Sequence, residues 1–152
     1  MKKDLITRLN EGPVLCAEGY LFAMERRGYL QAGAFVPEVV LEHPEVLSQL
    51  HREFIRSGSD VIQAFTYYGH REKLRIIGKE QLLEPLQKNA LQIAKDSREE
   101  FKDLDLMVCG DVANTNVYDP NDKKSNVECQ KMFEEQVSWA KEAGVDFVIA
   151  ET

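Results

Sequence analysis

Two acidic residues stand where a protein with parallel strands places its chemistry. Glu151 closes the apolar run 145–150, and Glu18 follows the shorter run 14–17. Both runs are short and apolar, which predicts buried strands. The carboxyl ends of parallel strands open onto one crevice, so we expect Glu151 and Glu18 to face a common site and bind a cation such as an ammonium group. The alternative for each is a solvated carboxylate at a strand end.

Aromatic residues form a second candidate group. Phe35, Tyr67 and Tyr68 fall in predicted loops at the carboxyl ends of strands. Aromatic rings there can enclose a quaternary ammonium or sulfonium group by cation–π attraction, worth about 0.5–2 kcal/mol per ring. Ordinary packing among loop side chains is the alternative.

The cysteines invite a zinc site, but their predicted positions do not favour one. Cys16 and Cys109 fall on predicted strands and Cys129 on a helix, so we expect three separate, buried, apolar side chains. The histidines lack the H-E-x-x-H spacing of a zinc helix. The chain also has neither a glycine-rich phosphate loop nor a G-x-S-x-G nucleophile motif.

An internal repeat indicates how the chain is built. Residues 57–66 align without gaps on residues 143–152, an offset of 86 residues. The identical pairs are Gly58 with Gly144, Asp60 with Asp146, Ala64 with Ala150, and Thr66 with Thr152. The offset equals two units of about 43 residues, each long enough for a strand, a helix and their loops. The repeat therefore predicts consecutive β-α units.

The elements follow from hydrophobic periodicity and from stop signals. Strands are predicted at 14–17, 60–65, 106–110 and 145–152. Helices are predicted at 20–27, 44–57, 71–97 with a break near Pro85, and 125–143. A polar lead-in covers 1–13, and long loops cover 30–42 and 111–124.

The last helix carries two specific predictions. Ser125 and Glu128 fit a capping box, which would start the helix at Ser125. Its buried stripe is expected to contain Cys129, Phe133, Val137 and Ala140.

The order β-α-β-α-β-α-β predicts four parallel strands in an α/β fold, because each crossover is long enough to be helical. A complete (β/α)8 barrel needs about 250 residues. We therefore expect one domain, residues 1–152, equivalent to the N-terminal half of such a barrel. A half barrel leaves strand edges and an apolar face uncovered, so we expect an incomplete piece of a longer protein.

Composition and net charge narrow the classes of binding partner and the cellular location that we expect. The net charge is −7 and the pI about 5.0, which argues against a nucleic-acid partner. The sequence lacks a signal-peptide pattern at its N-terminus and an apolar run of membrane-spanning length. Three cysteines are most simply reduced thiols, so we expect a cytoplasmic protein.

Several segments resemble the betaine–homocysteine S-methyltransferases, within the homocysteine S-methyltransferase family. They are 18–29 (EGYLFAMERRGY), 42–45 (EHPE), 49–54 (QLHREF), 65–68 (FTYY), 72–74 (EKL) and 146–151 (DFVIAE). The resemblance covers the N-terminal half of the family's barrel. It implies a zinc-dependent enzyme that moves a methyl group from betaine to homocysteine, giving methionine and dimethylglycine.

The resemblance also implies roles for residues. Glu151 matches the acidic residue that holds the homocysteine amino group, and Tyr68 matches a donor-site tyrosine. Phe35 stands where the family has a donor-site tryptophan. The family's aspartate after the first strand falls on Ala17, and the neighbouring Glu18 is expected to substitute for it.

The zinc ligands of the family are an Asn-Cys strand end and a Gly-Gly-Cys-Cys segment, and this sequence contains neither. We therefore expect zinc only in the full-length family members, and no catalytic turnover by these 152 residues alone. Other methyl donors stay open, namely S-methylmethionine, a sulfonium propionate or methyl-folate. Two further alternatives also stay open: the full-length protein forms a homo-oligomer, or the chain is a non-catalytic half barrel that binds small molecules or dimerises.

Overall fold

The computed structural model describes residues 3–30 and 38–151. Their elements, in chain order, are α1 (Leu5–Glu11), α2 (Tyr20–Arg26), α3 (Val39–Glu42), α4 (Pro44–Arg56), β1 (Val61–Gln63), α5 (Arg71–Ile76), the 3-10 helix η1 (Glu80–Leu82), α6 (Leu83–Glu100), β2 (Met107–Ala113), α7 (Lys123–Ala143) and β3 (Phe147–Glu151). No helix in this described part has an apolar stretch long enough to cross a membrane.

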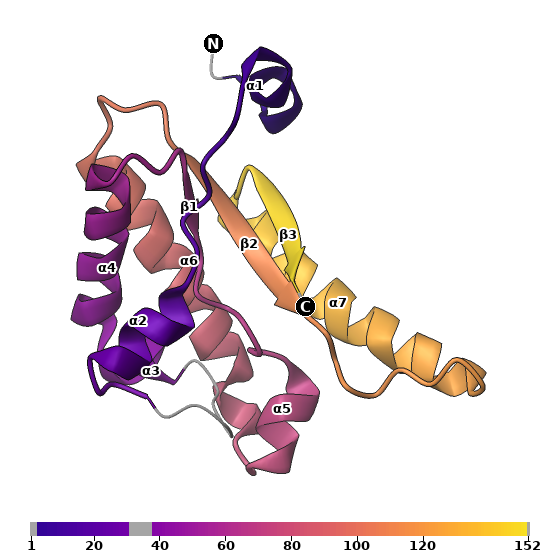
Figure 1. Ribbon diagram of the computed structural model, residues 1–152. Coiled ribbons are helices and arrows are strands. Elements are labelled where there is room, and N and C mark those ends of the chain that lie inside the picture. Colours follow the sequence, from indigo (N-terminus) through magenta and orange to yellow (C-terminus); the bar gives the residue numbers. More distant parts are fainter. Residues whose placement is uncertain (1–2, 31–37, 152) are drawn as a thin grey trace.

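The strands form one parallel sheet in the order β1-β2-β3 (Figure 1). Each strand is joined to the next through helices, which pack on the sheet as the alternating pattern requires. Apolar side chains on one face of the strands, among them Ile62, Val108 and Val148, pack in one cluster with Leu91 of α6 and Ala140 of α7. The parallel α/β architecture predicted from the sequence is confirmed.

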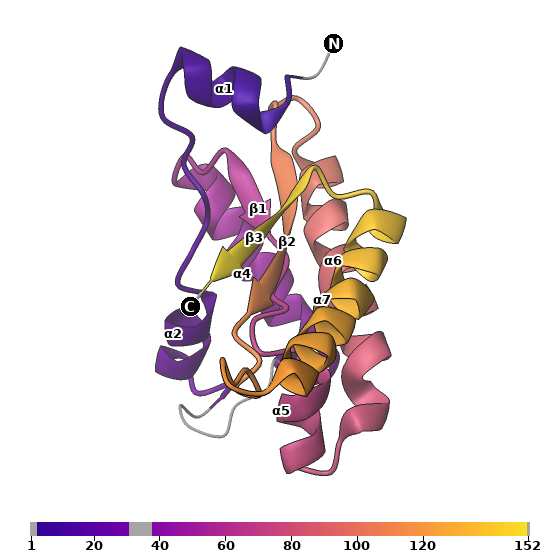
Figure 2. The ribbon, with the colours of Figure 1, turned by 90° about the vertical axis from the view of Figure 1, so that its right-hand side faces the viewer.

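The opposite face of the sheet carries the side chains that line the candidate functional site described below. Val61, Met107 and Cys109 are buried on this face, and Phe147 packs against them. Leu5 of α1 also packs on this cluster, and Figure 2 shows α1 beyond one end of the sheet, at the opposite end from α2. The other end of this face is where the strands finish and where polar side chains begin.

The internal repeat has a structural counterpart. Asp60 and Asp146 each precede a strand, and each carboxylate accepts a backbone N–H from the neighbouring strand segment. The donors are Leu15 and Val108, both at 2.8 Å. The repeated Gly58 and Gly144 both adopt positive φ, where glycine is favoured. The repeat therefore encodes a glycine helix stop followed by an aspartate that ties one strand to the next.

The prediction of four strands is wrong for the first of them. Residues 14–17 run parallel to β1 but form only a single bridge, between Cys16 and Val61. Two features limit the ladder: Pro13 has no N–H, and the N–H of Leu15 donates to the Asp60 side chain instead of a strand carbonyl. The described residues thus form three strands.

The third predicted strand ends later than expected. The sequence places its end at Gly110, but β2 continues through Asp111 and Val112 to Ala113, all paired with β3. Gly110 does not break the strand because it packs against α7. A Cβ added there would lie 3.1 Å from the Ala140 Cβ. Asp111 therefore belongs to a buried strand and not to a loop.

The start of α7 also differs from the prediction. Its N-cap is Asp122, whose side chain accepts from the Lys124 N–H, so the capping box at Ser125 and Glu128 is wrong. The Ser125 hydroxyl instead bonds within the preceding turn. The buried stripe is shifted too, because Val137 is 41% exposed and the buried positions are Ser125, Cys129, Met132, Gln136 and Ala140.

Candidate functional site

A cavity of about 610 Å³ lies at the carboxyl ends of the strands. Its polar lining includes Glu18, Gln63, Asp111 and Glu151, which come from the segment before α2 and from all three strands. Phe65, Phe22 and Ile149 supply apolar wall. None of the lining residues that the structure describes is basic. The cavity is therefore acidic at one end and apolar around it, which suits a ligand with a cationic group on an aliphatic chain.

Strand register explains why these side chains meet. Cys109 pairs with Gln63 and Phe147, Asp111 pairs with Ile149, and Ala113 pairs with Glu151. Side chains two residues apart on a strand share a face. Gln63, Asp111 and Glu151 therefore project from the same face, on three neighbouring strands.

Asp111 is the most unusual group in the cavity. It is 3% exposed, and neither carboxylate oxygen has a hydrogen-bond partner among the described residues. Burial, together with the negative charges of Glu151 and Glu18, raises the pKa of Asp111 to about 8. The Gln63 amide faces Asp111 and acts to lower its pKa, although no well-aligned hydrogen bond joins them. A proton or a cationic ligand would therefore stabilise Asp111.

The two carboxylates predicted from the sequence do come together here. Glu151 and Glu18 both line the cavity, and both raise the pKa of Asp111. Asp111 itself was missed, because the sequence pattern placed it in a loop. The signal that could have found it is alternation: Val108, Gly110 and Val112 face the helices, so Cys109 and Asp111 must face the cavity.

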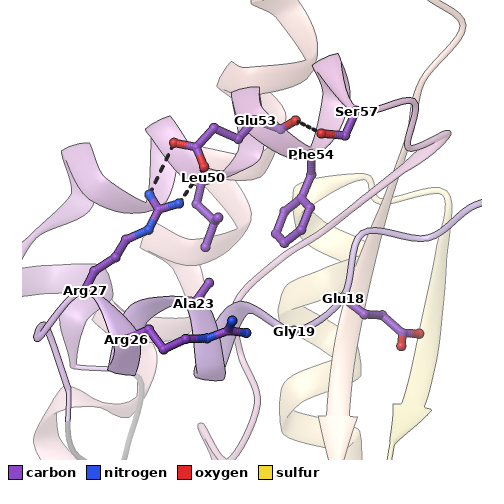
Figure 3. A pocket seen from close by; sticks show the side chains of 9 residues that line it. All are labelled: Glu18, Gly19, Ala23, Arg26, Arg27, Leu50, Glu53, Phe54 and Ser57. Carbon is purple, nitrogen blue, oxygen red and sulfur yellow. Dashed lines mark hydrogen bonds and ion pairs between the residues drawn. The ribbon is translucent and has the colours of Figure 1, made fainter.

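A second cavity, of about 390 Å³, lies between α2 and α4 (Figure 3). Its carboxylate, Glu53, is already engaged by the Arg27 guanidinium at 2.5 Å. Glu18 borders both cavities, and in Figure 3 its side chain points away from Phe54 and the other labelled side chains. The unbalanced negative charge therefore belongs to the first cavity.

The aromatic candidates are only partly placed. Tyr67 lines the acidic cavity, and its ring centroid lies 4.2 Å from that of Tyr68. A hydrogen bond with Tyr68, burial and the nearby carboxylates raise the pKa of Tyr67 to about 12, so its hydroxyl stays protonated. The Lys73 ammonium lies 4.5 Å from the centroid of the Tyr68 ring. Phe35 lies outside the described residues.

The cysteines correct one expectation. Cys129 is buried and contacts the Thr115 hydroxyl at 3.0 Å, apart from the other two. Cys16, however, packs against the cluster that contains Cys109, and the interaction of the two thiols lowers the pKa of Cys16 and raises that of Cys109. They meet because the bridge to Val61 brings residue 16 beside the sheet.

The residues described here do not fit the zinc that the resemblance implies. Across residues 3–30 and 38–151, no group of three or more His, Cys, Asp or Glu side chains is placed to hold a metal ion. The Cys16–Cys109 pair offers two thiols without a third ligand of that kind.

Comparisons with known proteins show which family this chain resembles. Residues 19–152 match the family model described as homocysteine S-methyltransferase. Betaine–homocysteine S-methyltransferase 1 from Mus musculus is 41% identical over 155 residues, covering 99% of this chain and 37% of that protein. The Sus scrofa protein of that name is 40% identical, covering 99% of this chain and 54% of that protein.

Solved structures show the same fold. The homocysteine methyltransferase MmuM from Escherichia coli, in its metallated form, superposes with a TM-score of 0.78 at 20% identity, over 97% of this chain and 56% of that one. Its oxidized form gives a TM-score of 0.76. This chain thus spans little more than a third to a half of the relatives it matches. The match over residues 19–152 shows that this chain belongs to the homocysteine S-methyltransferase family.

Proposed function

We propose that these residues form the homocysteine-binding half of a methyltransferase barrel. The observation that carries the proposal is the acidic cavity at the strand ends, bordered by Glu151, Glu18 and Asp111. Homocysteine carries an ammonium group, which these carboxylates complement, and a short aliphatic chain, which Ile149 and Phe65 can cover. The reaction, transfer of a methyl group to the homocysteine sulfur, belongs to the whole barrel.

Betaine is the methyl donor we propose, because the relatives named above are betaine–homocysteine methyltransferases. Tyr68 supports a cationic donor, since its ring already attracts the Lys73 ammonium. Phe35, predicted from the sequence as a donor-site aromatic residue, lies outside the described residues and stays part of the proposal. The zinc of the proposed enzyme would be held by residues beyond those described here.

The test measures methyl transfer from betaine to homocysteine by the whole barrel protein and by its Glu151→Ala variant. Removing one counter-charge of the ammonium should raise the homocysteine KM about tenfold or more. The betaine KM should change much less, because Glu151 is assigned to the other substrate. An unchanged homocysteine KM would reject the role of Glu151, and activity with S-methylmethionine but not betaine would reject the donor. The cytoplasmic location and a homo-oligomeric assembly stay predictions.

A further inference from the structure

Asp111 has a position that the general assignment of the site does not explain. It lies on β2 between Gln63 of β1 and Glu151 of β3, and it lines the acidic cavity while being 3% exposed. A buried carboxyl group with no donor is costly, so such groups are normally paired or hydrogen-bonded. Both oxygens of Asp111 lack a partner among the described residues.

Among the residues that the structure describes, no positive charge is found to act on the pKa of Asp111. Glu151 on β3 and Glu18 before α2 are the charges that raise its pKa. The negative charge of Asp111 in turn acts to raise the pKa of Tyr67, Cys16 and Cys109, as one of several causes for each. Each of these groups is neutral when protonated and negative when deprotonated, so none of them supplies a cation to pair with Asp111.

Gln63, on the neighbouring strand β1, is the polar side chain beside Asp111. Its Oε1 is also buried without a partner, and the amide faces Asp111. Because Gln63 acts to lower the pKa of Asp111, the amide N–H is the part that faces the carboxyl group, and Oε1 is left without a partner among the described residues. Burial and the charge of Glu151 outweigh this donor, and a proton on Asp111 removes a negative charge from beside Glu151.

We propose that Asp111, together with Glu151, binds the ammonium group of the amino-acid substrate and exchanges a proton for it. This inference rests on the proposed function and adds a binding residue to it. In the empty cavity Asp111 is a neutral carboxylic acid. When the ammonium binds, the O–H bond of Asp111 breaks, the proton passes to solvent, and the carboxylate pairs with the ammonium. One proton is released for each ligand bound.

The test uses L-methionine, the product of the proposed reaction, because it carries the ammonium but has no thiol to release a proton. Its binding to the whole barrel protein is measured by calorimetry at pH 7 in two buffers with different ionisation enthalpies. The wild-type protein should release about one proton per ligand bound. The analogue 4-(methylthio)butanoate, which lacks the ammonium, should release none.

Three variants test whether the proton released on binding comes from Asp111. Asp111→Asn keeps the shape of the side chain, so it should fold, bind L-methionine about 30-fold more weakly and release no proton. Cys16→Ser should still release the proton, which separates Asp111 from the neighbouring thiol. Asp103→Asn, on an exposed carboxylate, is the matched control and should behave like the wild type.

Two results would overturn the inference: wild-type binding without proton release, or unchanged binding and unchanged proton release in the Asp111→Asn variant. If methyl transfer to homocysteine proceeds while either result is obtained, the proposed function stands and only the role of Asp111 fails. If neither homocysteine nor L-methionine binds, both fail.

Discussion

Asp111 and Glu151 project from the same face of two neighbouring parallel strands into one cavity. Asp111 pairs with Ile149, and Glu151 pairs with Ala113, so the two carboxylates are offset by two residues along the sheet. Burial and the negative charge of Glu151 together raise the pKa of Asp111 to about 8. The strand ends thus combine two acidic groups that repel each other until a cation arrives.

Asp111 should make the folded chain less stable as the pH rises. Its pKa is raised in the folded state, so between about pH 4 and pH 8 the folded chain holds a proton that the unfolded chain has lost. Relative to wild type, Asp111→Asn should therefore gain about 1.4 kcal/mol in unfolding free energy per pH unit from pH 5 to 7.5. Denaturant titrations at several pH values measure this. Parallel pH profiles for the two proteins would contradict the burial of an uncompensated Asp111.

Replacing Glu151 with glutamine should lower the pKa of Asp111. The substitution removes the negative charge that ranks first among the neighbouring charges acting on Asp111 and leaves the side-chain volume nearly unchanged. The pKa can be followed through the carboxyl carbon by NMR in protein labelled at aspartate. Glu128→Gln, at an exposed position on α7, is the control and should leave Asp111 unaltered. A pKa of Asp111 that does not respond to Glu151 would mean that the two groups do not share the cavity.

His51 should make the fold sensitive to acid. It is completely buried in α4, its Nδ1 bonds to the Tyr20 hydroxyl at 2.9 Å, and burial lowers its pKa to about 3. In the unfolded chain His51 is protonated near pH 6.5, whereas in the folded chain it stays neutral. The contribution of neutral His51 to the unfolding free energy is therefore complete above pH 6.5 and is lost as the pH falls toward 3.

His51→Gln should remove about 2 kcal/mol of the decrease in unfolding free energy between pH 7 and pH 5. His43→Gln is the matched control, because the His43 side chain is 44% exposed. Urea titrations at the two pH values give the comparison. Equal pH slopes for wild type and His51→Gln would show that His51 is not held neutral.

The repeated aspartates should have equal structural roles. Asp60 and Asp146 each accept one strand N–H at 2.8 Å, and Asp146 also contacts Arg98 at 3.3 Å. Each change to alanine should cost about 1–3 kcal/mol of unfolding free energy, because a backbone N–H loses a charged acceptor. Asp103→Ala, at an exposed position, should stay within about 0.5 kcal/mol of wild type. A neutral effect at either repeated aspartate would show that the repeat has no structural role there.

Much of the fold could be predicted because local patterns and tertiary contacts agree. The glycine stops before Asp60 and Asp146, the amphipathic period of α4 and the apolar run of β3 each specify an element without help from the rest of the chain. The failures occur where distant partners decide. Residues 14–17 have strand-like composition, but Pro13 and the Asp60 side chain limit their pairing. β2 extends past Gly110 because β3 offers five partners in register.

The site was predictable in part for the same reason. Glu151 and Glu18 follow apolar runs, so their placement at strand ends could be inferred from sequence. Asp111 could not, since aspartate after glycine is typical of a turn, and only pairing with β3 keeps it in the sheet. The contact between Cys16 and Cys109 likewise depends on how segments far apart in the chain are brought together, which spacing alone does not show.

The most direct test of the account compares L-homocysteine with 4-mercaptobutanoate, which has the same carboxylate and thiol but no ammonium group. Dissociation constants are measured by calorimetry for the whole barrel protein, with Glu151→Gln alongside. If the acidic cavity recognises the ammonium, homocysteine should bind about 100-fold more tightly than the analogue, and Glu151→Gln should reduce that preference. Equal affinities for the two compounds in the wild-type protein would contradict the assignment of Glu151 and Asp111 to the substrate ammonium.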